Sequence, residues 1–187
     1  SVSSLPVRLI EPTESMPFHS HYSELVTQGK RQQLKSRLKK LIPGFADVEL
    51  LTTKSGRPTL YMIDQEDRAV NLNLIGDGLV SFIHLTLQLM TRQEALLLLE
   101  EPEVHQHPGL LFETARILLE AMREGKQVIL TTHSIELIDC LIHHASPEDL
   151  QQIGVIRLKK DGDDIFTSLR QGEDLKFDRE TLYEDLR

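Results

Sequence analysis

The sequence predicts an α/β fold of mainly parallel strands flanked by helices, with a small β-hairpin near its end. Residues 95–99 are an unbroken apolar run, which is typical of a strand buried on both faces of a parallel sheet. A helical pattern and a second apolar strand follow that run, as in a parallel crossover. Segments 153–159 and 165–170 flank Asp161-Gly162, a sequence typical of a hairpin turn.

The second half of the chain alternates strands and helices. A helix is predicted over residues 110–123, a strand over 127–131 and a helix over 134–142, with Ser134 as its N-cap. Crossovers between parallel strands are right-handed, and neighbouring parallel strands end at the same edge of the sheet. We therefore expect the segments that follow the two strands to lie close together.

The first half is predicted to contain one long helix and a second hairpin. Its expected elements, in chain order, are a strand at 7–10, a loop at 11–21, a helix at 23–41, hairpin strands at 48–53 and 58–63, a strand at 71–75 and a helix to about residue 90. We expect a single partial domain over residues 1–187. Its parts are residues 1–70, a core over 71–145, and a closing hairpin with a C-terminal helix over 146–187.

Composition and charge limit the possible functions. The chain has 187 residues with 40% hydrophobic content, enough for one domain with a core. A net charge of −8 argues against a protein that coats nucleic acid without specificity. The single cysteine fits a reducing compartment, and the longest apolar run, residues 95–99, is far too short to cross a bilayer. We expect a cytoplasmic protein with no membrane partner.

Two adjacent carboxylates end the predicted strand at residues 95–99. Glu100 and Glu101 precede Pro102, which disfavours helical geometry at Glu101. On an extended backbone the two side chains point in different directions. One carboxylate can then face a hydrated Mg²⁺ ion while the other polarises an attacking water.

A histidine follows the next strand. Thr132-His133-Ser134 joins residues 127–131 to the following helix, so the crossover is expected to bring His133 near Glu100 and Glu101. An imidazole at this position can donate a hydrogen bond to a phosphate oxygen. A local cap or packing role is the alternative for such a histidine, and the acidic pair one crossover earlier favours the functional interpretation.

These motifs resemble a known family. Two segments are similar to the ABC-type ATPase core of OLD-like and RecF- and SMC-related proteins. They are Glu100-Glu101-Pro102-Glu103, followed by His105 and His107-Pro108, and later Thr132-His133-Ser134. The resemblance is clearest from Gly76 to Ser134. It implies the C-terminal lobe of a P-loop ABC-type ATPase head.

The resemblance also implies roles for individual residues. Glu100 would be the Walker B acid that binds Mg²⁺ through water, Glu101 the catalytic glutamate and His133 the sensor of the γ-phosphate of ATP. The turn Gly76-Asp77-Gly78 resembles the signature motif, which contacts a nucleotide held by a partner subunit. An alternative register, with Glu101 on the metal and Glu103 on the water, stays open because Glu100 replaces the commoner aspartate.

The sequence has no Walker A motif, Gly-x-x-x-x-Gly-Lys followed by Ser or Thr. Its two Gly-Lys pairs both lack the first glycine of this motif. Glu24 stands at that position before Gly29-Lys30, and Glu120 stands there before Gly125-Lys126. In the family that motif lies in an N-terminal lobe. We therefore expect the chain to need a Walker A-containing lobe or subunit, and to hydrolyse no ATP alone.

Three functions remain open at this stage. The first is an ATPase half-site that forms a homodimer in the ATP state and acts on DNA or an effector, for which the basic residues between Lys30 and Lys40 are a possible DNA contact. The second is an inactive module for dimerisation or protein binding. The third is a metal-dependent hydrolase that uses Glu101, Glu103, His105 and His107.

Overall fold

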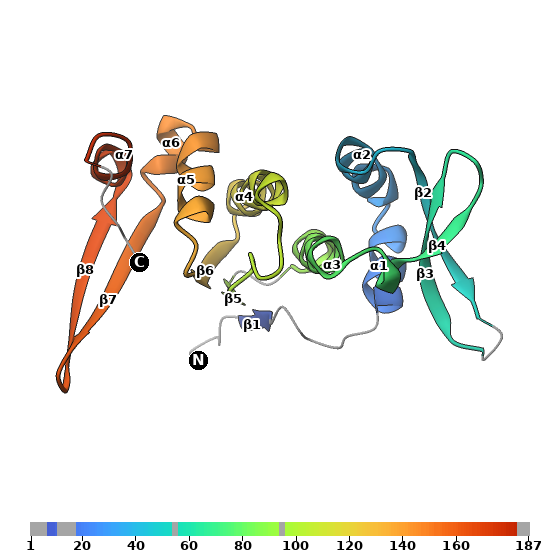
Figure 1. The fold of residues 1–187 in the computed structure, drawn as a ribbon, viewed down its shortest axis with the longest axis horizontal. Helices are drawn as coiled ribbons and strands as arrows, with labels where there is room; N and C mark the ends of the chain where they lie inside the picture. The colour runs from blue at the N-terminus through green and yellow to red at the C-terminus, as the bar shows by residue number, and fades with distance from the viewer. Residues whose placement is uncertain (1–6, 11–17, 54–55, 94–95, 183–187) are drawn as a thin grey trace, which may run out of the picture.

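The computed structural model describes residues 7–10, 18–53, 56–93 and 96–182 (Figure 1). The first half contains β1 (Val7–Ile10), α1 (Phe18–Thr27), α2 (Arg31–Leu41), β2 (Phe45–Thr52), β3 (Pro58–Asp64), β4 (Ala69–Asn71), a 3₁₀ turn η1 (Leu72–Leu74) and α3 (Asp77–Thr91). The second half contains β5 (Leu96–Glu100), α4 (Pro108–Arg123), β6 (Gln127–Thr131), α5 (Ile135–His144), α6 (Pro147–Leu150), β7 (Gly154–Asp161), β8 (Asp164–Gln171) and α7 (Gly172–Glu180). The predicted α/β fold is confirmed.

Three sheets divide the strands. The parallel sheet has the order β1-β5-β6, β2-β3-β4 form an antiparallel sheet, and β7-β8 form a hairpin. Figure 1 shows the antiparallel sheet and the hairpin at opposite ends of the molecule, with the parallel sheet between them. The strand–helix–strand unit over β5, α4 and β6 is the predicted parallel crossover, with Leu99 opposite Leu130 and Glu100 opposite Thr131.

The single helix predicted over residues 23–41 is wrong. Two helices, α1 and α2, occupy this region, and Gly29 between them has a φ of +72°. That left-handed conformation ends a helix at little cost only when the residue has no Cβ. The loop predicted over 11–21 is also wrong at its end, because α1 begins at Phe18, while residues 11–17 lie outside the described part.

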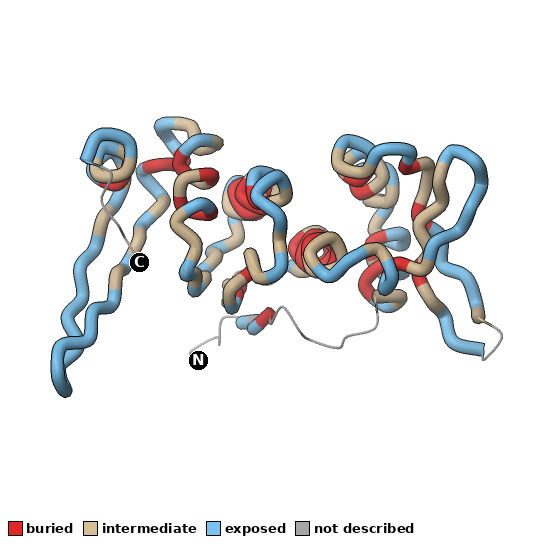
Figure 2. The backbone as a smooth tube through the Cα atoms, viewed as in Figure 1, coloured by how far each residue is buried: buried red, intermediate tan, exposed pale blue. Residues whose placement is uncertain are grey.

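The main core lies around α3. This helix buries Phe82, Ile83 and Leu87, and it packs against both α1 and α4. Leu97 and Leu99 of β5 join the same cluster from the sheet. Figure 2 shows the buried segments concentrated along the central helices. A second, smaller cluster is formed by α5, α6 and α7, with Ile138, Ile142, Leu150 and Leu175 as its buried members.

Only one face of the parallel sheet is covered by the described helices. Ile10, Leu97 and Leu99 point to the helical side and are at most 4% exposed. The alternate residues Leu9 and Ile129, which share the register of Leu98, are 49% and 52% exposed. The prediction that the strand at residues 95–99 is buried on both faces is therefore met on one face only, because α3, α4 and α5 all lie on the same side of the sheet (Figure 1).

Among the described residues, no helix is both long enough and apolar enough to cross a membrane.

Candidate functional site

The candidate site lies at the carboxyl ends of β5 and β6. Glu100 is the last residue of β5 and lies opposite Thr131, the last residue of β6. Glu101 and His133 follow these strands, so both occupy the same edge of the sheet. In open parallel sheets this edge is where ligands bind.

Glu101 and His133 approach each other across this edge. The imidazole Nε2 of His133 lies 3.4 Å from Oε1 of Glu101. Their side chains are 88% and 39% exposed, respectively, so an incoming ligand can reach both. The crossover therefore brings together the carboxylate and the histidine that the sequence indicated.

The backbone of Glu101 differs from the extended geometry expected before a proline. Its φ is +39°, in the left-handed region that glycine favours. Its amide nitrogen lies 3.1 Å from the carbonyl oxygen of Thr131 and 3.3 Å from the hydroxyl of the same residue. These hydrogen bonds to β6 hold Glu101 in a conformation that its own side chain disfavours. Strain of this kind is concentrated at functional sites.

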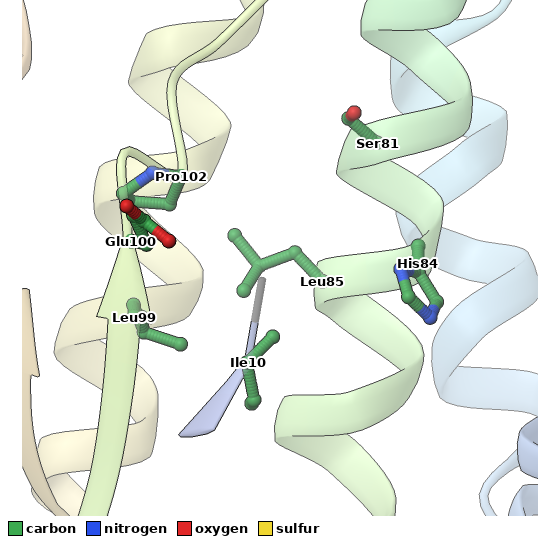
Figure 3. Close-up of a pocket in the computed structure, with 7 residues that line it drawn as sticks. All are labelled: Ile10, Ser81, His84, Leu85, Leu99, Glu100 and Pro102. Atoms are coloured by element: carbon green, nitrogen blue, oxygen red, sulfur yellow. The ribbon is translucent and has the colours of Figure 1, made fainter. Parts of the chain in front are cut away.

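Glu100 contributes to a different surface from Glu101. It lines a small pocket between β5 and α3 (Figure 3). The other residues of this pocket are Ile10, Ser81, His84, Leu85, Leu99 and Pro102. Glu100 thus lines this pocket while Glu101 approaches His133, and a left-handed turn at Glu101 stands where an extended backbone was expected.

The predicted signature turn packs against the loop that follows β5. Gly76 precedes α3 with a φ of +108°, and Asp77 is the first residue of that helix. A Cβ atom on Gly78 would lie 2.3 Å from the carbonyl oxygen of His105. The start of α3 therefore touches the loop that carries Glu101, so the signature turn and the acidic motif belong to one connected region.

Glu103 has a role in the structure that the sequence did not indicate. Its Oε1 accepts a hydrogen bond from the Thr132 hydroxyl and another, at 3.2 Å, from the His133 amide. The partners lie 29 and 30 residues away in the chain, and no local spacing rule predicts such a pair. A carboxylate three residues after a strand end is the only signal that the sequence contains.

His105 and His107 do not form the metal site of the third hypothesis. Nδ1 of His107 accepts a hydrogen bond from the amide of Gly109, so this histidine is the N-cap of α4. Within the described ranges, no group of three or more His, Cys, Asp or Glu side chains could hold a metal ion.

Several of the basic side chains around α2 are engaged within the molecule. Arg31 and Lys35 bind Asp47 at 3.1 and 2.9 Å, and Arg37 pairs with Glu120 of α4. These ion pairs attach α2 to β2 and α4. They leave Lys39 and Lys40 as the exposed charges at the end of the helix.

The comparison with known families identifies the chain. Residues 4–139 match the model of the family described as "AAA domain, putative AbiEii toxin, Type IV TA system". The chain belongs to this AAA-domain family. Uncharacterized protein MJECL11 of Methanocaldococcus jannaschii is 35% identical over 114 residues, which are 60% of the AAA-domain chain and 99% of the relative.

Solved structures agree on the fold. The AAA-domain chain superimposes with a TM-score of 0.60, at 13% identity, on a structure from work on ATP-driven dimerization and DNA-stimulated activation of SMC ATPases, covering 88% of this chain and 98% of the other. The Smc head domain of Pyrococcus furiosus, bound to the C-terminal domain of ScpA, superimposes with a TM-score of 0.55 at 12% identity. This alignment covers 87% of the chain described here and 41% of the Smc chain. The fold is therefore that of an SMC-related, ABC-type ATPase lobe.

Proposed function

We propose that this chain is the Walker B, signature and switch-histidine lobe of an ATPase, and that a lobe with a Walker A motif completes the site. The observation that carries the proposal is the convergence of Glu101 and His133, 3.4 Å apart, at the carboxyl ends of two adjacent parallel strands. A carboxylate there can accept a proton from an attacking water, and an imidazole can contact the phosphate that is released.

The remaining residues fit a bound nucleotide and Mg²⁺. Glu100 offers an exposed carboxylate at the strand end, which is the oxygen donor that Mg²⁺ prefers, directly or through water. When bound, the ion would neutralise charge on the phosphates of ATP. Glu101 orients the water, and His133 holds its imidazole toward the γ-phosphate position. The backbone of Gly76, Asp77 and Gly78, at the start of the long helix α3, is proposed to face a nucleotide on a second copy.

The bare face of the parallel sheet supports the need for a second lobe. Parallel sheets are normally covered on both faces, because their strands are apolar on both sides. Here Leu9 and Ile129 stay about half exposed on the face opposite the helices. β6 is also an edge strand: it pairs with β5 on one edge and with no strand of the described part of the chain on the other. A lobe carrying the Walker A motif would cover this face and extend the sheet.

Dimerisation and DNA coupling are proposed by analogy with the SMC ATPases. The matched SMC structure is described in terms of ATP-driven dimerization and DNA-stimulated activation, and this chain spans 98% of that chain. We propose that the completed head forms a homodimer in its ATP state and acts on DNA or an effector. Exposed Lys39 and Lys40 of α2 are the available phosphate contacts.

The test is ATP hydrolysis by this chain alone and by this chain with its Walker A lobe. Candidates for that lobe are sought among segments of the same gene and among proteins that copurify with this chain. We expect turnover only with both lobes. Glu101→Gln should lower kcat by at least about 100-fold while ATP binding is retained, because only the base is removed. Glu66→Gln, at an exposed glutamate far from the site, is the matched control.

Two results would contradict the proposal. One is wild-type turnover by the completed head that Glu101→Gln and His133→Ala leave unchanged. The other is hydrolysis by this chain alone that Glu101→Gln abolishes, since it would show that the chain needs no second lobe.

A further inference from the structure

Glu103 joins the two loops of the candidate site. It belongs to the loop after β5, while Thr132 and His133 belong to the loop after β6. A single carboxylate oxygen, Oε1, accepts from both the Thr132 hydroxyl and the His133 amide. Hydrogen bonds to a carboxylate are stronger than those between neutral groups, so this pair is a firm link between the loops.

The link extends to the start of α5. The Ser134 amide donates to the Thr132 hydroxyl oxygen at 2.9 Å, and that hydroxyl donates to Glu103. Ser134 in turn accepts from the Leu137 amide at 3.1 Å and caps the helix. The loop that carries His133 is therefore held at the Thr132 hydroxyl, at the His133 amide and at the Ser134 helix cap, and Glu103 provides the first two of these contacts from outside the loop.

Packing does not hold the ring of His133. Its side chain is 88% exposed, so the backbone of His133 sets where the side chain starts, and the ring reaches Glu101 only from that position. On the opposite side, the Glu101 amide is bound to Thr131 at 3.1 Å. The 3.4 Å approach of His133 to Glu101 thus requires that the two loops keep their relative position.

We infer that Glu103 is a positioning residue, which sets His133 against Glu101 by binding Thr132 and the His133 amide. The inference rests on the proposed function for its effect on ATP hydrolysis. The second oxygen, Oε2, is buried and has no hydrogen-bond partner among the described residues. The link therefore uses one acceptor oxygen, which glutamine also supplies, and this allows a conservative variant.

The first test needs only this chain. Hydrogen exchange of the His133 backbone amide is followed by NMR in the wild type and in Glu103→Ala, Glu103→Gln, Thr132→Val and Glu66→Ala. Exchange should be about tenfold faster in Glu103→Ala, because the acceptor is lost, and little changed in Glu103→Gln and in the exposed control. Thr132→Val keeps the shape of the side chain and removes the donor, so it tests the link even if Glu103→Ala does not fold.

The second test uses the completed head. Glu103→Ala should lower kcat about tenfold or more with little change in KM for ATP, and Glu103→Gln should restore most of the rate. In the double variant Glu103→Ala/Thr132→Val, kcat should fall by less than the product of the two single reductions, because both substitutions break the same hydrogen-bonded link.

Unchanged exchange at His133 in Glu103→Ala and Thr132→Val would overturn the inference, as would independent effects of the two substitutions. If the wild-type completed head hydrolyses no ATP, the proposed function fails, and the exchange experiment on this chain still decides whether Glu103 positions His133.

Discussion

Gly78, in the first turn of α3, lies directly against the carbonyl oxygen of His105, where a Cβ atom would come within 2.3 Å. His105 itself has a φ of +64°, so the loop after β5 turns its backbone toward α3 through a left-handed residue. The start of the helix and the loop that carries Glu101 thus fit together only because residue 78 has no side chain. A backbone carbonyl cannot move aside as a flexible side chain can.

Gly78→Ala should therefore destabilise the chain by about 1–3 kcal/mol, the usual cost of a forced overlap in a packed region. Chemical denaturation of both proteins measures the difference. Gly109→Ala is the matched control, because Gly109 is also in the first turn of a helix and its added Cβ would meet the His107 ring at ordinary contact distances, 3.4 Å from Nδ1 and 3.9 Å from Cε1. Equal stability of the two variants would show that α3 can move away from His105.

The sequence predicted the central part of the fold because that part follows from local patterns. The apolar run before Glu100 identified β5, and the parallel pairing of β5 and β6 was enough to bring His133 to the same edge. The break between α1 and α2 was also visible in principle, since Gly29 interrupts the helical pattern. It was missed because Leu34, Leu38 and Leu41 have a helical spacing, and the predicted helix was extended from them back to residue 23 across Gly29.

Other features of the site come from contacts between distant segments. The left-handed backbone of Glu101 is held by hydrogen bonds from its amide to Thr131, which no pattern around residue 101 encodes. The same is true of Glu103 and its partner Thr132. The apolar pattern of β5 predicted two buried faces, and the described helices cover only one of them.

Asp149 should make stability depend on acid pH. This carboxylate is buried and accepts hydrogen bonds from the Arg123 guanidinium and from the Ser146 amide, which lower its pKa from 3.8 to about 2. A carboxyl group with a lowered pKa in the folded state stabilises the fold above its unfolded value of 3.8 and loses that contribution as the pH falls toward 2. The contribution is on the order of 2 kcal/mol.

Asp149→Asn should remove this dependence. Unfolding free energies of the wild type and the variant are compared near neutral pH and at intervals down to about pH 2, where other carboxylates titrate equally in both. The variant should be less stable at neutral pH, and the gap should close in acid. Asp163→Asn, at an exposed turn residue, should show no gap. If the difference in unfolding free energy between the wild type and Asp149→Asn stays constant with pH, the substitution acts through packing and hydrogen bonding and not through the charge of Asp149.

Cys140 should react slowly with thiol reagents. It is the single cysteine of the chain, is 7% exposed in α5, and its pKa is raised first by burial and further by Asp139 and Glu136. Because the thiolate is the reactive form, labelling of the native chain should be at least about 100-fold slower than labelling in denaturant. Modification of the native protein as fast as the unfolded one would show that α5 opens readily.

The bare face of the parallel sheet leads to the last prediction. Ile129 is 52% exposed in β6, on the side that no described helix covers. Ile129→Lys should change the stability of this chain by less than about 0.5 kcal/mol, because the residue is at the surface. If a Walker A lobe covers this face, the same substitution buries a charge there, and affinity for that lobe should fall by at least about tenfold.

Val26→Lys, on an exposed position of α1 (41%), provides the control for added charge. Calorimetric titration of the two lobes measures the affinity, and chemical denaturation of this chain alone measures its stability. Unchanged affinity in Ile129→Lys would show that the second lobe binds elsewhere, which would leave the bare sheet face without its proposed occupant.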